Sequence, residues 1–216
     1  MLNRVVGLGV DRPATDEDVD AALAAIGEGV TFYVAVAQCA EPAELPAWLE
    51  ARGLERGWGW MSFSRSPDAP SAVETSLRLA RVESAAEAAA FARIQRVGFG
   101  LPDAVEPPIA LAPERGWECW LALDGDEPAG AGALFARDGS CYLGLGATLP
   151  EHRGKGAQGS LLAHRIHRAA ELGCDLVVTE TGERRDDRPS SSYRNILRAG
   201  FVEGAVTANW LGTRHE

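Results

Sequence analysis

Residues 150–162, Pro-Glu-His-Arg-Gly-Lys-Gly-Ala-Gln-Gly-Ser-Leu-Leu, carry the clearest chemical signal in the chain. They follow an apolar run at 141–147 and open an amphipathic segment that ends near Gly173. A glycine-rich turn at the start of a helix exposes backbone N–H groups that have no partner inside the helix, and the helix dipole adds positive charge there. Arg153 and Lys155 add two cationic side chains. The segment therefore predicts a phosphate-binding site at a helix start.

Two familiar phosphate-binding patterns, the Walker pattern and the dinucleotide fingerprint, fit this segment only in part. The Walker pattern needs Gly-Lys followed by Ser or Thr, whereas Gly156 follows Lys155. Gly154, Gly156 and Gly159 do spell the dinucleotide fingerprint G-x-G-x-x-G, and Glu180 lies near the distance of a ribose-binding acid. That fingerprint should begin directly after its strand, but residues 148–153 intervene here. A dinucleotide therefore remains the second interpretation.

A third pattern agrees with both the spacing and the context. The segment Arg153-Gly154-Lys155-Gly156-Ala157-Gln158-Gly159 resembles the acyl-CoA pyrophosphate loop of the GNAT superfamily of acyltransferases, Gln/Arg-x-x-Gly-x-Gly/Ala. Arg153 and Gly156 match the pattern, while Gln158 replaces its last small residue and Gly159 follows at once. Residues 192–201 resemble the family's later helix, which usually closes on Gly-Phe, here Gly200-Phe201. The resemblance covers about residues 75–213.

The resemblance implies an acetyl-CoA-dependent N-acetyltransferase without a metal, in which a small-molecule or peptide amine attacks the thioester directly through a tetrahedral intermediate. It implies that the strands expected at 141–148 and 175–181 splay apart where the thioester enters, and that a backbone N–H near Ala147 or Leu149 stabilises the oxyanion. The residues that it assigns to cofactor binding lie in the strand, the loop and the later helix. They are Ala147, Thr148, Leu149, Arg153, Gly154, Lys155, Gly156, Ala157, Gln158, Gly159, Ser160, Ser192 and Asn195.

The acid and the base are harder to assign. An alkylammonium acceptor must lose a proton before attack, and Glu180, at the end of its strand beside the expected split, is the candidate base. A surface or loop-anchoring role is an equal alternative. The family's frequent tyrosine acid falls at Ile196 here, so Tyr193, one helical turn earlier, is the candidate acid, with packing or CoA contact as the alternative. Because that acid position is apolar, a non-catalytic acyl-CoA sensor remains the alternative function.

The hydrophobic periodicity predicts elements in an order that suits this assignment. We expect a mixed, partly antiparallel GNAT-type α/β sheet flanked by helices, with prolines interrupting residues 98–116. The expected helices are at 84–97, after residue 156 to near Gly173, and 190–199. The expected strands are 76–82, 118–124, 131–137, 141–148, 175–181 and about 201–212. The middle helix should bury Leu161 and Ile166 and expose His164, Arg165, His167 and Arg168.

The first part of the chain looks like a partial repeat of the second half. Residues 7–13 echo residues 144–150, and a helix, a strand and a Gly-terminated helix follow each. We therefore expect residues 1–65 to form a degenerate β-α-β-α-β half-GNAT segment, 66–74 a linker and 75–216 the acetyltransferase domain. Thr15-Asp16-Glu17-Asp18 stands where the first copy should have its glycine loop. Its carboxylates satisfy the helix dipole and would repel a pyrophosphate, so this copy should bind no cofactor.

Composition bounds the remaining possibilities. A formal net charge of -10 argues against nucleic acid or an anionic membrane as the main partner. No apolar run approaches the roughly 20 residues of a membrane span, and the first ten residues are too short for a secretory core. Cys39, Cys119, Cys141 and Cys174 are scattered without metal-ligand spacing, which suggests reduced, buried thiols. We expect a cytoplasmic protein, monomeric or homodimeric.

Overall fold

The computed structural model describes residues 3–70, 73–184 and 191–214. The chain divides into two compact units. The first unit comprises Met1–Ser62, Thr181–Pro189 and Gly204–Glu216, and the second comprises Phe63–Glu180 and Ser190–Glu203. The predicted boundaries at 65 and 75 follow the sequence alone and remain a prediction, whereas the contacts group segments from both ends of the chain.

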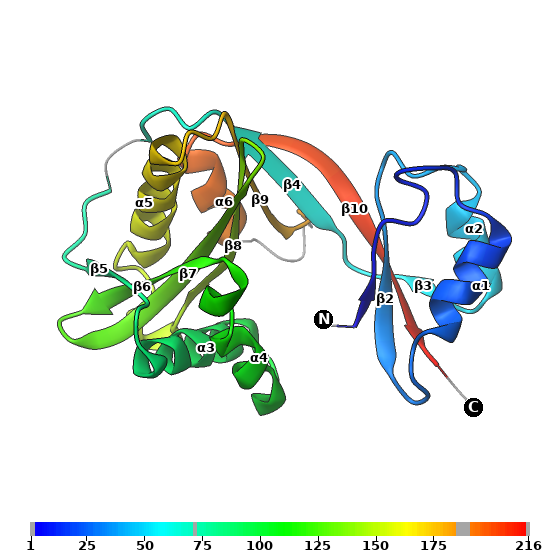
Figure 1. Cartoon of the computed structure of the whole chain (residues 1–216), viewed down its shortest axis with the longest axis horizontal. Helices are drawn as coiled ribbons and strands as arrows, with labels where there is room; N and C mark the ends of the chain where they lie inside the picture. Colours follow the sequence, from blue (N-terminus) through cyan, green and yellow to red (C-terminus); the bar gives the residue numbers. More distant parts are fainter. Residues whose placement is uncertain (1–2, 71–72, 185–190, 215–216) are drawn as a thin grey trace. The chain divides into compact units, whose positions relative to one another are not determined.

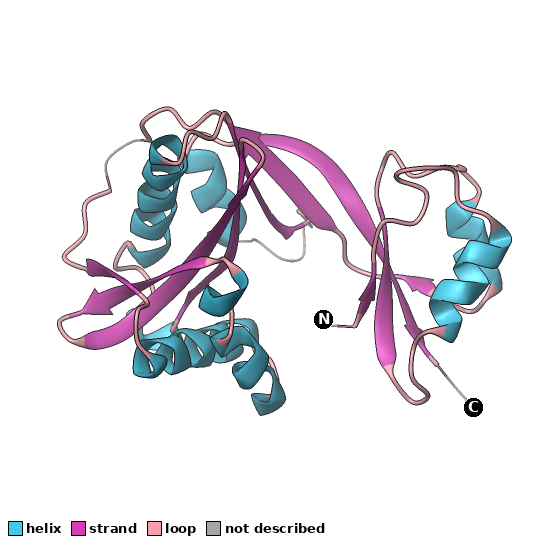
Figure 2. Ribbon diagram, viewed as in Figure 1, coloured by secondary structure: helices cyan, strands magenta, loops and turns pink. Residues whose placement is uncertain are grey.

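The first unit is a small sheet with two helices over one face (Figure 2). Its elements are β1 (Arg4–Val5), α1 (Asp16–Ala24), β2 (Thr31–Val36), α2 (Leu45–Ala51), β3 (Glu55–Arg56), the start of β4 (Trp60–Arg65) and most of β10 (Val202–Thr213). Strand β1 is parallel to β2, while β10 is antiparallel to both β2 and β3. The predicted β-α-β-α-β order is present, with β4 as an additional strand. Its origin as a decayed repeat remains a prediction.

Helix α1 begins at a complete capping box. Thr15 Oγ1 accepts a hydrogen bond from the Asp18 N–H at 3.1 Å, and the Asp18 carboxylate accepts one from the Thr15 N–H at 2.9 Å. The carboxylate also pairs with Arg12 at 2.7 Å. Side chains of the segment itself therefore satisfy this helix start, as the sequence predicted. The helix then packs Val19 into a core that includes Phe32, Leu45 and Trp210.

The second unit is a mixed sheet between helices (Figure 1). Its elements are β5 (Arg78–Arg81), α3 (Ala85–Phe99), α4 (Glu106–Ala110), β6 (Glu118–Asp124), β7 (Glu127–Arg137), β8 (Ser140–Thr148), α5 (Ala157–Glu171), β9 (Leu176–Gly182, to Glu180 in this unit) and α6 (Ser191–Arg198). Strands β5 to β8 pair antiparallel in sequence order, and β9 is parallel to β8. Strand β4, whose residues Phe63–Arg65 belong to this unit, lies next to β9. This is the predicted fold class.

The helices α3 and α5 cover opposite faces of this sheet (Figure 1). On one face, Phe91 and Ile94 of α3 pack on the odd-numbered residues of β6, such as Cys119 and Leu121. On the other face, Leu161 of α5 packs with Ala122. The period of two along β6 therefore sends alternate side chains to two separate cores.

Two predictions need correction here. Residues 98–116 are not irregular throughout, because they contain α4 and the short 3-10 turns Asp103–Val105 and Pro113–Arg115. Pro107 and Pro108 lie in the first turn of α4, where a missing N–H costs no helical hydrogen bond. The thiols are not all buried either, since Cys39 is exposed. Burial raises the pKa of Cys119 and of Cys141 to about 12, so both remain neutral thiols.

Candidate active site

The glycine loop connects β8 to α5 through the 3-10 turn Pro150–His152. Gly154 has φ +83° and Gly156 has φ +87°, a region that favours glycine. Gly156 is the N-cap residue of α5, no side chain caps this helix start, and its first turn contains no acidic residue. Because Ser160 is the first residue whose N–H bonds back to Gly156, the preceding amides of the turn are available to an anion.

Two groups of the second unit hold this loop from outside it. Thr75 Oγ1 donates to the Lys155 carbonyl at 2.7 Å, and a Cβ on Gly156 would lie 3.1 Å from Thr75 Cβ. On the other side, Asp124 Oδ2 lies 2.5 Å from Lys155 Nζ and 3.1 Å from His152 Nδ1. The bond from Lys155 holds the pKa of Asp124 below its usual value. The charged Lys155 side chain therefore lies at the loop and is paired with Asp124.

Three predicted cofactor residues meet between α5 and α6. Gln158 Nε2 donates to Ser192 Oγ at 2.9 Å, and Asn195 Nδ2 donates to Gln158 Oε1 at 2.7 Å. The Ser160 hydroxyl donates to the Ala157 carbonyl inside α5 at 3.1 Å, and Arg153 is exposed. The structure thus joins Gln158, Ser192 and Asn195 to one another, so their common contribution here is to fix α5 against α6.

Strands β8 and β9 part beside this loop. Their parallel pairing runs from Ser140↔Leu176 to Leu143↔Thr179, although β8 continues to Thr148 and β9 to Gly182. The last pair is reinforced by Thr179 Oγ1, which donates to the Leu143 carbonyl at 2.7 Å. The predicted splay of the two strands is present, and among the described residues no strand pairs with this edge of β8 from Gly144 onward, which we call the open edge.

A β-bulge lies on β8 at the start of this open edge. The β7–β8 register shifts between the pairs Ala131↔Ala147 and Ala133↔Gly144, and Leu145 has φ +52°. Beyond the bulge, Leu149 donates its N–H to the Ala129 carbonyl at 2.9 Å, and its own carbonyl accepts from His152 at 3.0 Å. Both polar groups of its backbone are therefore used within the fold.

Backbone alternation identifies which of the predicted cofactor residues Ala147, Thr148 and Leu149 directs its N–H group to the open edge. Successive residues of a strand direct their N–H groups to opposite sides. Because the Leu149 N–H points to β7, the N–H of Thr148 points to the open edge, and by the same alternation so does that of Gly146. Ala147 and Leu149 face β7 instead. Thr148 is the predicted strand residue that best suits a ligand lying along this edge.

Two buried side chains contact the bulge from opposite faces of the sheet. Arg165 of α5 is 2% exposed, and its Nη1 donates to the Ala133 carbonyl at 2.8 Å and to the Gly144 carbonyl at 2.9 Å. Gln95 of α3 is fully buried and donates Nε2 to the Leu145 carbonyl at 2.6 Å. The prediction that Arg165 is solvent-exposed is therefore wrong.

Glu180 and an aromatic cluster share one face of the sheet. The register pairs Tyr142 with Val178, so Val178 and Glu180, two residues further, lie on the same face as Tyr142. Trp117 packs there with its ring centroid 5.9 Å from that of Tyr142 and 5.5 Å from that of Phe135. Glu180 itself is half-buried. A carboxylate and an apolar wall thus border the same side of the open edge.

Tyr193 is built into the packing of α6. It is 5% exposed, its hydroxyl donates to Glu203 Oε1 at 2.7 Å, and its ring meets the edge of Phe63 with centroids 4.9 Å apart. Ile196, at the position of the family's acid, is also buried. The structure brings the Tyr193 hydroxyl to the Glu203 carboxylate.

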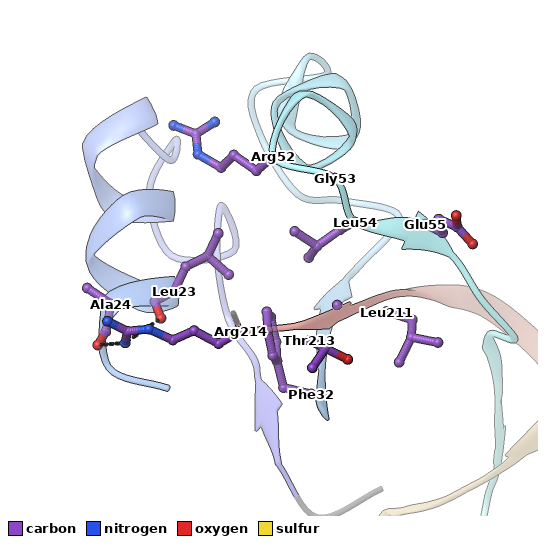
Figure 3. Close-up of a pocket in the computed structure, with 11 residues that line it drawn as sticks. Leu23, Ala24, Phe32, Arg52, Gly53, Leu54, Glu55, Leu211, Thr213 and Arg214 are labelled. Atoms are coloured by element: carbon purple, nitrogen blue, oxygen red, sulfur yellow. Dashed lines mark hydrogen bonds between the residues drawn. The ribbon is translucent and has the colours of Figure 1, made fainter. Parts of the chain in front are cut away.

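A separate hollow of about 590 Å³ lies within the first unit (Figure 3). Leu23, Phe32 and Leu54 line its apolar wall. Its two guanidinium groups are already used, because Arg52 pairs with Asp16 at 2.8 Å and with Asp20 at 2.7 Å, and Arg214 Nη1 bonds carbonyls at the end of α1. These arginines tie α1 to its neighbours, and the glycine loop does not contribute to this hollow.

Sequence inspection missed Arg165, Gln95, Thr75 and Asp124. A signal for Arg165 exists in the alternating glycines Gly130 and Gly132 of β7 and Gly144 and Gly146 of β8, since glycine inside a strand often marks a bulge or a close approach. A Cβ on Gly132 would lie only 2.7 Å from Arg165 Cζ. The other three make contacts between segments distant in sequence, for which the chain carries no local pattern.

The described ranges contain no group of three or more His, Cys, Asp or Glu side chains arranged to hold a metal ion. In the same residues, none of the helices combines the length and the apolar character that crossing a membrane requires.

Comparison with known proteins relates the second unit to one family. Residues 86–188 match the acetyltransferase (GNAT) family, and this segment runs from α3 through β8 and the glycine loop to β9. This segment of the chain is therefore similar to a GNAT acetyltransferase domain. No curated protein matches it significantly.

Solved structures share the fold at low sequence identity. A GCN5-related N-acetyltransferase from Sphaerobacter thermophilus is 14% identical with a TM-score of 0.68 over 91% of this chain, which spans 64% of that protein's length. One from Kribbella flavida is 18% identical with a TM-score of 0.64, over 96% of this chain and 79% of the other. A tandem GNAT protein from the clavulanic acid biosynthesis pathway is 16% identical with a TM-score of 0.62, over 91% and 67%. At these identities the likeness shows the fold.

Proposed function

We propose that this protein transfers an acetyl group from acetyl-CoA to the amine of a small molecule or peptide. The observation that carries the proposal is the continuous arrangement of an open β8 edge, a bulge, and a glycine loop that leads into an uncapped helix. An extended chain with an anionic end fits this path, because the edge offers strand-like hydrogen bonds and the helix start offers amides to phosphate.

The residues that hold the pyrophosphate in this proposal are those of the loop from Gly154 to Gly159. The amides of the first turn of α5 donate to phosphate oxygens, and Lys155 and Arg153 provide positive charge. The open backbone groups of β8, with Thr148 nearest the loop, bind the pantetheine arm. Acetyl-CoA supplies the activated acyl group, and no metal is required for its attack by an amine.

The acceptor side of the proposal rests on Glu180 and its neighbours. A carboxylate on the face of Tyr142 and Trp117 can attract an alkylammonium and, directly or through water, take its proton before attack. The acetyl transfer then forms the amide and releases the CoA thiolate, which needs a proton. Tyr193 can supply that proton only after its bond to Glu203 is broken, so water is the competing donor.

The loop assignment is tested by a pair of variants at Gly154. A Cβ there has no heavy atom within 4 Å, and Asp and Asn tolerate positive φ better than other side chains. Gly154→Asp places a carboxylate beside the pyrophosphate and should weaken acetyl-CoA binding by at least about 100-fold, as expected for like charges a few ångströms apart. Gly154→Asn has the same shape without the charge and should lose less than about 10-fold.

Titration calorimetry with acetyl-CoA measures both affinities. Equal affinity of the two variants would exclude the pyrophosphate from this loop, and tight binding of NAD(P) with no binding of acetyl-CoA would favour the dinucleotide interpretation. Turnover is measured by release of free thiol across a panel of small amines and peptide N-termini. Binding without turnover on any amine would contradict the proposed catalysis.

A further inference from the structure

Three carbonyls around the β8 bulge accept hydrogen bonds from only two buried side chains. Arg165 bonds Ala133 and Gly144, which are cross-strand partners, and Gln95 bonds Leu145, the next residue of the bulge. The two side chains come from α5 and α3, on opposite faces of the sheet. We call Arg165 and Gln95 the bulge clamp.

Arg165 is a buried cation without an ion-pair partner in the described part of the chain. Its contacts are carbonyls, including that of Leu161 at 2.9 Å, and the neighbouring Cys119 and Cys141 are neutral thiols. Burial lowers the pKa of Arg165 to about 10, so it stays charged at neutral pH. A buried charge of this kind is costly because it loses its hydration, and an apolar side chain would fill the space at lower cost. Packing alone therefore does not explain an arginine here.

Leu145 shows what the clamp holds in place. Its φ of +52° is unfavourable for a residue with a Cβ, and such a conformation persists only where its surroundings enforce it. Hydrogen bonds to the carbonyls of Gly144 and Leu145 fix the peptide groups on both sides of this residue. The clamp thus stabilises the strained conformation that creates the bulge.

The same hydrogen bonds act on the N–H groups of the bulge. The peptide group whose carbonyl accepts from Gln95 carries the N–H of Gly146, and the one that accepts from Arg165 carries the N–H of Leu145. A hydrogen bond accepted at the carbonyl polarises the peptide and strengthens its N–H as a donor, most when the partner is charged and the surroundings are dry. Alternation counted back from the Leu149 N–H, which bonds β7, directs the Gly146 N–H to the open edge of β8.

We propose that Arg165 and Gln95 are positioning residues that hold and polarise the β8 bulge so that the Gly146 N–H binds the thioester carbonyl oxygen of acetyl-CoA. This inference rests on the proposed function. The clamp does not touch the substrate, and it acts through the backbone that does. Its removal should impair activation of the carbonyl more than binding of the CoA portion, because the glycine loop remains intact.

The test uses the carbonyl stretch of acetyl-CoA labelled with ¹³C at the acetyl carbonyl, bound to the full-length protein. In the wild type this infrared band should move to lower frequency relative to free acetyl-CoA, since a hydrogen bond weakens the C=O bond. In Arg165→Met and Gln95→Met the shift should be smaller, while calorimetry shows acetyl-CoA affinity within a few-fold of wild type. With an active amine, kcat should fall about 10-fold or more with little change in KM for acetyl-CoA.

Two further variants keep the test decisive if Arg165→Met does not fold. Gly132→Ala retains both clamp residues but displaces the Arg165 guanidinium, because the new Cβ would lie 2.7 Å from Cζ. Arg168→Met is the matched control, since it removes an arginine of the same helix that pairs with Glu118 at 2.9 Å and bonds no carbonyl of the bulge, and it should leave the band unchanged. Folded variants with the wild-type band, or an unshifted band in the wild type, would overturn the clamp. Absence of any acetyl-CoA binding would instead refute the proposed function.

Discussion

At the scale of single residues, the two proton-transfer candidates differ in what their side chains already contact. Tyr193 donates its hydroxyl to Glu203 and is packed on Phe63. The side chain of Glu180 makes no hydrogen bond within the described residues and lies half-buried on the face that carries the aromatic cluster. A group that must exchange protons with a ligand is better placed when its side chain has no competing partner. Glu180 is therefore a stronger candidate for the base than Tyr193 is for the acid.

Tyr193→Phe should therefore affect stability more than catalysis. The variant retains the ring and removes the hydroxyl bond to Glu203, which is worth about 1 kcal/mol, and this loss lowers the melting temperature of a chain of this size by about 2–4 °C. Turnover should change by only a few-fold. A loss of about 10²–10⁴ in kcat, with acetyl-CoA affinity intact, would assign the acid role to Tyr193 instead.

Glu180→Gln should lower the rate most at neutral pH. Without the carboxylate, only the small fraction of acceptor that is already deprotonated can attack, and that fraction grows as the pH approaches the amine's pKa of about 10. The pH–rate profile should move to higher pH, with little change in acetyl-CoA binding measured by calorimetry. An unaltered profile would exclude Glu180 as the base and leave proton transfer to water.

The exposed and loop residues of the site were easier to predict from the sequence than its buried polar ones. Gly154 and Gly156 carry a pattern with a physical reason, and the structure gives both the positive φ that the pattern requires. Arg165 was misplaced because helical periodicity assigns a charged residue to solvent. Its actual environment depends on glycines of two strands that approach α5 only in the folded chain.

At the scale of elements, Thr75 connects the segment before β5 to the glycine loop. Its hydroxyl donates to the Lys155 carbonyl and accepts from the Leu77 N–H at 3.1 Å. Thr75→Val keeps the methyl group and the branch but loses both bonds. Acetyl-CoA should bind about 5–10-fold more weakly, as expected for loss of about 1 kcal/mol of loop positioning, with kcat at saturation unchanged.

Thr75→Ser is the matched control for this position, because it retains the hydroxyl and should bind acetyl-CoA almost as wild type does. A fall in kcat without a change in affinity in Thr75→Val would contradict a role limited to the loop.

The strands were predictable where alternation is strict. The predicted strand 118–124 coincides with β6, whose alternate residues enter two different cores. The helix at α4 was missed because its prolines were taken as interruptions, although the first turn of a helix tolerates them. The bulge at Leu145 was missed for another reason. Its conformation is enforced by Gln95 and Arg165, which lie far from it in the sequence.

At the scale of the whole molecule, helix α1 of the first unit and helix α5 of the second unit begin in different ways. Helix α1 begins with a capping box and a carboxylate paired to Arg12, whereas α5 begins with glycine and no cap. Each helix connects two parallel strands: α1 lies between β1 and β2 in the chain, and α5 lies between β8 and β9. A common origin of the two segments remains a prediction, but the difference at the helix starts bears directly on how many ligands one chain binds.

Each chain should bind one acetyl-CoA. In the first unit, Asp18 occupies the position where a pyrophosphate would bind at a helix start, and the bonds from Arg12 and Thr15 hold the pKa of this carboxyl far below its usual range, so it stays ionised and repels phosphate. Calorimetry on the full chain should give a stoichiometry of one. Gly154→Asp should reduce the binding heat to none over the same concentration range, because it alters the single loop proposed to hold the pyrophosphate. If one equivalent still binds with wild-type affinity in Gly154→Asp, the acetyl-CoA site lies elsewhere in the chain, and the first unit becomes its first candidate.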